Sequence, residues 1–504
     1  MTHPDPSDSP RPASRVSRRA FIAAAALALP APLRGDPYRR WLRPQPAPLR
    51  PVRIRGRVVA GGKGIPRVGI SDGLQVVSTS ADGSFELVSD GTRPFVSAVL
   101  PAGYEIPRRG TGAFRLSRPI LPTPGGEANA LFELTQLTDS DDRHAFLVLA
   151  DPQTRDRDEM GLFHSQTVPD VISTIRGFGA TQVFGVADGD IMYDDLTMYA
   201  DYERAVKQFG IPFAQVVGNH DLDLKTDRDE ASTATFQEHF GPTYYSFDRG
   251  QVHYVVLDDV FYYGGGYLGY LADEQLRWLA ADLARVERGS PVVVFLHIPL
   301  QSQMFARAGR ERPEISNTVT NRDALVRLLE PFNARAISGH THESDHRTEG
   351  AVIEHNVGTV CGAWWTGDIC YDGTPNGYGI FRVDGESFRW RYKATGLPDS
   401  HQLRVYPRGA DPRAPEEVVA NVWGWDPSWT VTYAVNGEPK GLMSRRRGLD
   451  PRSVLLHTGP EMPAKRPWVE PVVTDHLFYA PVPEGASVIV EARDRWGDVY
   501  RNSI

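Results

Sequence analysis

The stretch of sequence that best defines the fold runs from Phe213 to Asp221 and reads FAQVVGNHD. Its apolar first half is typical of a buried strand, and it ends abruptly in polar residues. Four other short apolar runs end in the same way, at residues 145–150, 182–187, 292–296 and 334–338. Helical patterns lie between the runs, which indicates an α/β layered domain. Because such domains gather ligands at the carboxyl ends of their strands, we expect a functional site there.

Each of the five loops that follow these runs offers a possible metal ligand. The candidates are carboxylates, amides and imidazoles: Asp151, Gln153, Asp190, Asn219, His297, His340 and His342. These groups suit Mn, Fe, Zn or Mg better than copper(I) or an iron–sulfur cluster. The set is too large for one tetrahedral ion and suits two ions bridged by Asp190. Two neighbouring ions activate water as hydroxide and neutralise a phosphoryl group in transfer, so the pattern favours phosphoester hydrolysis.

The order of these motifs resembles that of the calcineurin-like metallophosphoesterase superfamily, whose D-x-H, G-D, G-N-H-D/E, H and G-H-x-H motifs match residues 145–342 in turn. The resemblance implies two sites for Mn, Fe or Zn ions. The first site is expected to contain Asp151, Gln153, Asp190 and His342, and the second Asp190, Asn219, His297 and His340. The resemblance also implies that His220 is not a ligand but faces the substrate, where it stabilises the transition state or protonates the leaving oxygen. Asp221 is expected to orient His220.

One predicted ligand departs from the family pattern, because Gln153 stands where the superfamily usually has histidine. An amide oxygen is a weaker and harder ligand than an imidazole nitrogen, so the first site is expected to prefer Mn, Fe or Mg over Zn, or to be partly vacant. In the alternative interpretation Gln153 only forms hydrogen bonds to nearby loops. Asp188 and Asp194 are candidates for orienting the bridging carboxylate, although a helix cap explains Asp194 equally well.

The flanking regions differ in texture from the centre. Residues 51–135 and 398–504 contain short strands separated by Gly, Asp and Pro, which predicts a β-sandwich-like domain on each side of the catalytic domain at 141–397. The resemblance implies a four-layer α/β/β/α sandwich for that central domain. Residues 361–365 and 372–378 resemble a bacterial exported branch of the superfamily that has dedicated N- and C-terminal β-domains.

Trp364 and Trp365 either form an aromatic wall for the substrate or pack at a domain seam. Three arginines at 445–447 are expected in a solvated loop.

The first residues of the chain resemble an export signal. Ser17, Arg18, Arg19 and Phe21 begin a short apolar run, a pattern typical of a cleavable twin-arginine signal peptide over residues 1–31, followed by a linker at 32–50. We therefore expect a periplasmic or extracellular protein with no transmembrane segment after cleavage. In such a compartment Cys361 and Cys370 either form a disulfide or remain as two free thiols.

Composition narrows the range of partners. A net charge of −8 over 504 residues provides little attraction for polyanions and counts against extended nucleic acid. The expected partner is a small phosphorylated molecule such as an envelope lipid, a nucleotide or a sugar phosphate. The leading hypothesis is a hydrolase of phosphomonoesters, phosphodiesters or pyrophosphates in the cell envelope. Its rival is a non-catalytic protein that holds metal and binds an envelope component.

Overall fold

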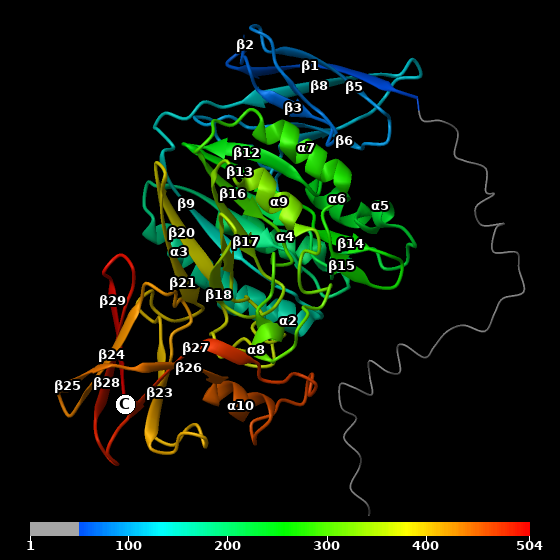
Figure 1. Cartoon of the computed structure of the whole chain (residues 1–504). Coiled ribbons are helices and arrows are strands. Elements are labelled where there is room, and N and C mark those ends of the chain that lie inside the picture. The colour runs from blue at the N-terminus through cyan, green and yellow to red at the C-terminus, as the bar shows by residue number, and fades with distance from the viewer. Residues whose placement is uncertain (1–49) are drawn as a thin grey trace, which may run out of the picture. The chain divides into compact units, whose positions relative to one another are not determined.

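The computed structural model describes residues 50–504. The predicted signal peptide and all of the linker except Arg50 lie outside the described residues. Within them, strands at 52–134 and 404–503 flank a mixed region of strands and helices at 143–394 (Figure 1). None of the helices in residues 50–504 has the length and apolar character that a membrane crossing requires.

Two mixed sheets form the centre of the molecule. The first has the order β11 (Phe213–Val216), β10 (Gln182–Asp188), β9 (Arg143–Leu149), β20 (Gly377–Asp384) and β21 (Ser387–Ala394). The second has the order β12 (Tyr245–Arg249), β13 (Val252–Val256), β16 (Pro291–Phe295), β17 (Asn333–Ser338), β19 (Val352–Asn356) and β18 (Asp345–Glu349). Strands β9, β10 and β11 run parallel to one another, as do β13, β16, β17 and β19. The five predicted strands are therefore present, and their carboxyl ends gather at one edge of each sheet.

Successive side chains of each strand point to opposite faces of the sheet, and their packing partners show how the layers are arranged. Phe146 and Phe184 share the core between the two sheets with Tyr254 and Phe295. The next residue along β9, Leu147, points away from this core and packs in a second cluster. That cluster includes residues of α3 (Val168–Gly177) and α4 (Tyr199–Phe209). The outer face of the second sheet is covered by α7 (Asp273–Leu283) and α9 (Arg322–Leu329). The predicted four-layer α/β/β/α sandwich is confirmed.

Shorter elements complete the central domain. They are α2 (Arg157–Leu162), the π-helical η2 (Phe163–Thr167), the 3-10 helix η3 (Leu196–Met198), α5 (Asp229–Ser232), α6 (Ala234–Phe240), α8 (Met304–Arg307), β14 (Val260–Tyr262) and β15 (Tyr267–Gly269).

The N-terminal domain is a sandwich of two four-stranded sheets. One contains β1 (Val52–Ala60), β2 (Lys63–Gly64), β5 (Ser84–Ser89) and β8 (Glu127–Leu134), and the other β3 (Gly69–Ser71), β4 (Val76–Ser78), β6 (Phe95–Ala98) and β7 (Ser117–Pro119). Strand β8 alternates strictly between exposed and buried residues, as expected for a sheet that covers a core on one face only.

The C-terminal domain also has two four-stranded sheets. One contains β22 (Arg404–Tyr406), β23 (Glu417–Asn421), β26 (Ser444–Leu449) and β27 (Val473–Pro481), and the other β24 (Thr430–Val435), β25 (Glu438–Leu442), β28 (Val488–Arg493) and β29 (Val499–Ser503). The prediction of a loop at residues 445–447 is wrong, because the three arginines lie within β26 with their side chains exposed. The chain also forms a helix in this domain, α10 (Pro451–His457), capped by Asp450.

Candidate metal centre

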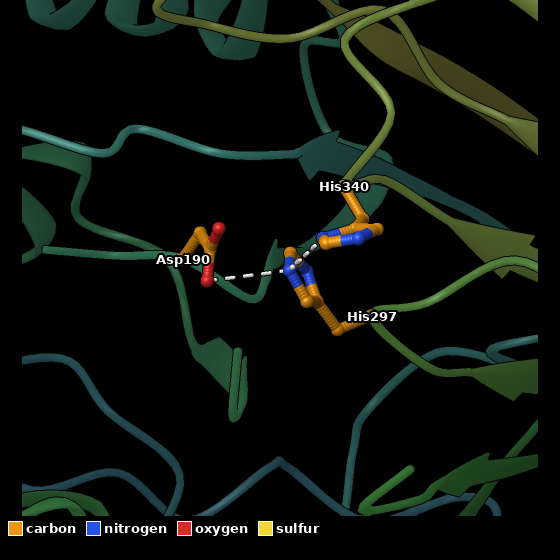
Figure 2. Close-up of side chains that lie close together, drawn as sticks. All are labelled: Asp190, His297 and His340. Carbon is orange, nitrogen blue, oxygen red and sulfur yellow. Dashed lines mark hydrogen bonds and ion pairs between the residues drawn. The ribbon is translucent and has the colours of Figure 1, made fainter. Parts of the chain in front are cut away.

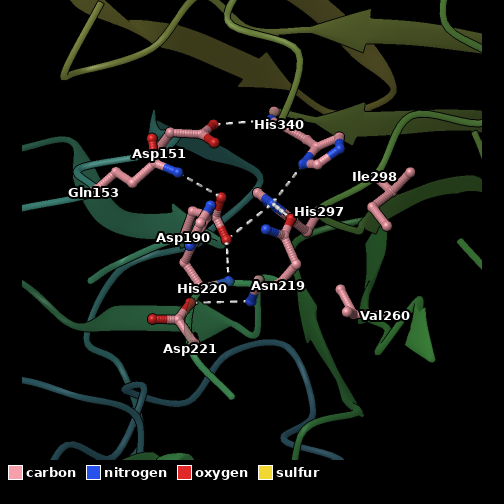
Figure 3. A network of polar contacts seen from close by, with 12 residues as sticks. Asp151, Gln153, Asp190, Asn219, His220, Asp221, Val260, His297, Ile298 and His340 are labelled. Atoms are coloured by element: carbon pink, nitrogen blue, oxygen red, sulfur yellow. Dashed lines mark hydrogen bonds and ion pairs between the residues drawn. The ribbon is translucent and has the colours of Figure 1, made fainter. Parts of the chain in front are cut away.

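The seven predicted ligands lie in the loops that directly follow parallel strands of both central sheets. Asp151 and Gln153 follow β9, Asp190 follows β10, Asn219 follows β11, His297 follows β16, and His340 and His342 follow β17. The structure brings all seven into one network of polar contacts, most of which is drawn in Figure 3. The network therefore joins the two sheets at their carboxyl edges.

Backbone conformation at the centre is unusual. Asp151, Gln153, Asp190, His340 and His342 all have positive φ, between 41° and 69°. Non-glycine residues rarely adopt this left-handed region, and each instance costs on the order of 1–3 kcal/mol. The sharp turn it produces directs each side chain inward immediately after its strand ends. Strain of this kind concentrates at functional sites.

The glycines of two motifs are explained by close approach. A Cβ atom on Gly218 would lie 2.0 Å from the backbone nitrogen of Asp190, and one on Gly339 would lie 2.4 Å from Oδ2 of Asp151. Both distances are far below van der Waals contact. Only glycine therefore allows the neighbouring carboxylates to reach their positions.

Asp190, His297 and His340 form the tightest group, with their ligand atoms all within 4.8 Å of one another (Figure 2). His297 Nε2 lies 3.2 Å from Asp190 Oδ1 and 3.2 Å from His340 Nδ1. Asn219 Oδ1 is also 3.2 Å from His297 Nε2. These four residues are the predicted second site.

Backbone carbonyls orient the three imidazoles of the centre. His297 Nδ1 lies 3.0 Å from the carbonyl of Asp188, and His340 Nε2 lies 2.9 Å from that of Ser316. His342 Nδ1 lies 2.5 Å from the carbonyl of Gly362. A carbonyl accepts a hydrogen bond, so each of these nitrogens carries a proton and the opposite nitrogen of each neutral ring presents a lone pair to the centre.

This arrangement fits bound cations. When both rings are neutral, His297 Nε2 and His340 Nδ1 are acceptors like the facing oxygens of Asp190 and Asn219. Oδ1 of Asp151 is buried without a hydrogen-bond partner in the described part of the chain, and it lies 3.5 Å from His342 Nε2. Positive charge would satisfy both groups. Metal binding at these residues is therefore consistent with the chemistry of the whole donor set.

Gln153 joins the two predicted sites by a hydrogen bond. Its Nε2 donates to Asp190 Oδ2 at 2.9 Å, and its Oε1 lies 3.6 Å from the thiol of Cys361. This orientation is the hydrogen-bonding alternative considered from the sequence. Gln153 can act as a metal ligand only if its amide turns to direct the oxygen toward Asp190. The ligand role of Gln153 therefore stays a prediction.

The two cysteines are free thiols, and both are buried. Burial raises the pKa of Cys370 and raises that of Cys361 well above its usual value. Of the two alternatives left open by the sequence, the structure has the free thiols. Cys361 was not anticipated at the centre, where it contacts both Gln153 and His342.

His220 lies beside the ligand cluster with its side chain 23% exposed. Its Nδ1 is 2.7 Å from Asp194 Oδ1, and its ring stacks on Tyr193 at 4.4 Å between centroids. Burial lowers the pKa of His220, but the negative charges of Asp190 and Asp194 outweigh it and raise the pKa above 6.5. The contact with Asp194 thus fixes the imidazole at Nδ1, and Nε2, on the other side of the ring, takes no part in that contact.

The prediction that Asp221 orients His220 is wrong. The Asp221 carboxylate is fully buried and accepts hydrogen bonds from the backbone N–H groups of Ile191, Met192 and Gly218 and from the hydroxyl of Tyr199. Burial, reinforced by the charge of Asp190, raises the pKa of Asp221 to about 7. Asp221 therefore joins the two loops that carry Asp190 and Asn219, and the residue that contacts the His220 ring is Asp194.

The other two flanking aspartates also have defined positions. The helix-cap explanation of Asp194 is wrong, because Asp195 caps η3 through the backbone N–H of Thr197. Asp188 is fully buried, and neither of its carboxylate oxygens has a hydrogen-bond partner in the described residues. Burial raises the pKa of Asp188 well above its usual value. Its contribution to orientation comes from the backbone carbonyl that holds His297.

Aromatic and cationic side chains border the centre. Trp364 packs on His342 with 4.4 Å between ring centroids, and Trp365 Nε1 donates to the carbonyl of Pro152. Contact of either tryptophan with substrate stays a prediction. The exposed guanidinium of Arg155 lies 5.4 Å from the ring centre of Tyr193. Arg155 and Tyr193 belong to no motif, so the sequence offered no signal for them.

Comparison with known proteins agrees with this geometry. The N terminal of Calcineurin-like phosphoesterase family matches residues 52–137, the Calcineurin-like phosphoesterase family matches 144–344, and the C terminal of Calcineurin-like phosphoesterase family matches 354–500. Together these matches account for all three domains.

Individual relatives are more distant. The mouse serine/threonine-protein phosphatase CPPED1 is 34% identical over 154 residues, which are 29% of this chain and 46% of that protein. Purple acid phosphatase 22 of Arabidopsis thaliana is 30% identical over 174 residues, 31% of this chain and 36% of that protein. The solved structure of purple acid phosphatase PPD1 from yellow lupin has a TM-score of 0.36 at 12% identity and covers 68% of this chain and 67% of its own.

The chain thus spans less than half the length of these two curated relatives. The family matches, by contrast, extend from residue 52 to residue 500. On that basis the chain belongs to the calcineurin-like metallophosphoesterases, a family of hydrolases, and carries their N- and C-terminal domains.

Proposed function

We propose that the protein hydrolyses a small phosphomonoester, phosphodiester or pyrophosphate at a centre of two metal ions. The observation that carries the proposal is the set of lone pairs directed at one another by Asp190, Asn219, His297 and His340, with the partnerless oxygen of Asp151 beside them. When bound, two ions there supply an activated water and neutralise charge on the phosphoryl group. Mn, Fe and Zn all suit these ligands.

The residues of the chain have separate tasks in this proposal. Asp190 offers one carboxylate oxygen to each ligand set, and the backbone carbonyls fix the imidazoles that face it. His220 donates a proton from Nε2 to the leaving oxygen. Asp194 accepts the hydrogen bond of Nδ1–H, which keeps the His220 pKa raised and more of the ring protonated at neutral pH.

Kinetics of two histidine variants test this role. His220→Ala should lower kcat by about 10²- to 10⁴-fold on aryl phosphomonoesters or phosphodiesters while the metal content is unchanged, since His220 is not a ligand. His239→Ala is the matched control, because His239 pairs with Glu203 on the nearby helices. It should stay within about twofold of wild type. If the protein loaded with Mn, Fe or Zn hydrolyses neither class of ester, the non-catalytic, envelope-binding alternative replaces the proposal.

We further propose that the protein acts outside the cytoplasm, in the periplasm or the extracellular space. The support is the twin-arginine pattern at Arg18 and Arg19. A reporter enzyme fused to residues 1–49 should be exported, and the same fusion with the double substitution R18K/R19K should remain in the cytoplasm. Export that is unaffected by the double substitution would contradict this route.

A further inference from the structure

A segment of the C-terminal domain, residues 458–472, lies against the loops of the metal centre. Its Arg466 is 7% exposed and forms an ion pair with the buried Glu159 of α2, with Nη1 2.8 Å from Oε1 and Nη2 3.1 Å from Oε2. Nη1 of Arg466 also donates to the backbone carbonyl of Trp364. A buried two-point ion pair of this kind fixes geometry strongly, because either charge left alone would be costly.

The ion pair between Arg466 and Glu159 also contacts two different loops of the metal centre. Glu159 Oε2 accepts a hydrogen bond from the backbone N–H of Arg155, two residues after Gln153. The guanidinium carbon of Arg466 lies 5.4 Å from the ring centre of Tyr193, the residue that stacks on His220. The 458–472 segment is therefore attached to the loops that follow both β9 and β10.

The segment places an unusual side chain beside the centre. Trp468 is 50% exposed, and its ring lies 4.6 Å from that of Trp364, which itself packs on His342. Arg466 has a left-handed backbone (φ 53°) and is followed by Pro467, whose ring fixes the next φ angle. The direction of Trp468 is thus set by the backbone as well as by the ion pair. A tryptophan ring is flat and apolar, so its exposed half offers a surface on which another flat ring can stack.

We propose that Trp468 is a specificity-determining residue that stacks on a flat organic group of the phosphoester, and that Arg466 is the residue that positions it. The proposal rests on the proposed function, since the phosphoryl group must be held at the metal centre for its ester group to reach Trp468. Two aromatic contacts, of 4.6 Å and 4.4 Å between ring centres, connect Trp468 to His342 through Trp364, so a flat group that extends from the phosphoryl group can reach Trp468. The substrate class is then a phosphoester that carries a flat ring, such as an aryl or nucleoside phosphoester, rather than one with a purely aliphatic group.

Binding and turnover of two simple probes test the proposal. Phenyl phosphate carries a ring and propyl phosphate does not, and each is titrated calorimetrically into the Mn-loaded full chain and assayed for hydrolysis. Trp468→Ala should weaken binding and raise KM for phenyl phosphate about tenfold, the equivalent of one stacking contact. Propyl phosphate should change by less than about twofold. Trp468→Phe should restore most of the preference, and Leu442→Ala, an exposed apolar residue of β25, should have no effect.

Arg466→Gln should show the same ring-selective loss, because it releases Trp468 without removing it. A purely structural role would instead weaken both probes equally. The inference is overturned if Trp468→Ala changes both probes by the same factor or changes neither. If the wild type prefers phenyl phosphate in binding but hydrolyses neither probe, the proposed function fails while this assignment stands.

Discussion

At the metal centre, side-chain direction is fixed mainly by backbone atoms. Carbonyls hold His297, His340 and His342, and three backbone N–H groups hold the Asp221 carboxylate. Backbone groups of ordered loops move little, so the ligands are preorganised for metal ions. The strain of five left-handed residues is the cost of that arrangement.

Asp221 and Asp194 both lie near His220 but have different hydrogen-bond partners. Conservative substitutions should therefore separate the roles of the two aspartates. Asp221→Asn replaces two carboxylate oxygens, which accept from three backbone N–H groups, by one amide oxygen and an NH2 group that can only donate. We expect a loss of about 1–3 kcal/mol in the free energy of unfolding, measured by chemical denaturation.

Asp194→Asn should leave stability unchanged and lower kcat instead. The raised pKa of His220 depends partly on the Asp194 charge, so the acidic form of His220 should be lost at lower pH than in wild type. The pH profile of kcat checks this expectation. Equal losses of stability in the two variants would contradict the distinction.

Motifs in the sequence predicted which residues meet at the centre but not how each side chain points. Asp221 follows His220 directly, and adjacency predicts contact, yet the Asp221 carboxylate accepts hydrogen bonds from the backbone N–H groups of Ile191 and Met192 instead. Asp194 reaches His220 from a different loop. Arg155, Tyr193 and Cys361 arrive through folding alone, because nothing in their local sequence distinguishes them from ordinary loop residues.

At the scale of elements, a buried ionic group joins β13 to its neighbours. His253 lies between Asp248 of β12, 2.7 Å from Nδ1, and Asp282 of α7, 3.0 Å from Nε2. Burial lowers the pKa of His253, but Asp282 and Asp248 together raise it to about 10.

This pairing predicts a pH-dependent stability. The folded pKa of about 10 exceeds the unfolded value of 6.5, so the contribution is complete below about pH 6.5 and is lost as the pH rises toward 10. The free energy of unfolding of wild type should exceed that of His253→Gln by on the order of 1–3 kcal/mol at pH 6. The difference should shrink steadily to pH 10. A difference that is constant over this range would contradict the pairing.

Elements with a strong burial pattern could be predicted, and weakly patterned ones could not. The five strands that carry the ligands are almost entirely buried, and their apolar runs identified them. Strand β25 is exposed at every position and β26 at most, so neither shows alternation. Helix α10 has only seven residues, too few for a helical repeat to be recognised in the sequence.

At the scale of the whole molecule, buried charges join the central and C-terminal domains. Arg307 at the end of α8 contacts Asp345 of β18 and Glu343 on one side and Asp475 of β27 on the other. The Arg307 side chain is 2% exposed. This cluster lies next to the loop of His342, so it also helps to place the C-terminal domain beside the metal centre.

Loss of this arginine should therefore be severe. Arg307→Ala removes the counter-ion of Asp345 and Glu343 and leaves Asp475 with Arg447 alone, and we expect a destabilisation of about 3–5 kcal/mol. Arg501→Ala is the control, because Arg501 pairs with Glu491 at the surface with 66% of its side chain exposed. The control should cost less than about 1 kcal/mol. Similar melting curves for the two variants in calorimetry would show that the cluster does not hold the domains.

Metal content, determined together with hydrolysis on the same purified sample, tests most directly whether the protein is a phosphoesterase with two metal ions. At saturation with Mn, Fe or Zn we predict two ions per chain and hydrolysis of an aryl phosphomonoester or phosphodiester. Asp190→Ala should lose both, because Asp190 contacts both ligand sets. At most one ion per chain, with no hydrolysis of either ester and no effect of Asp190→Ala, would contradict the account.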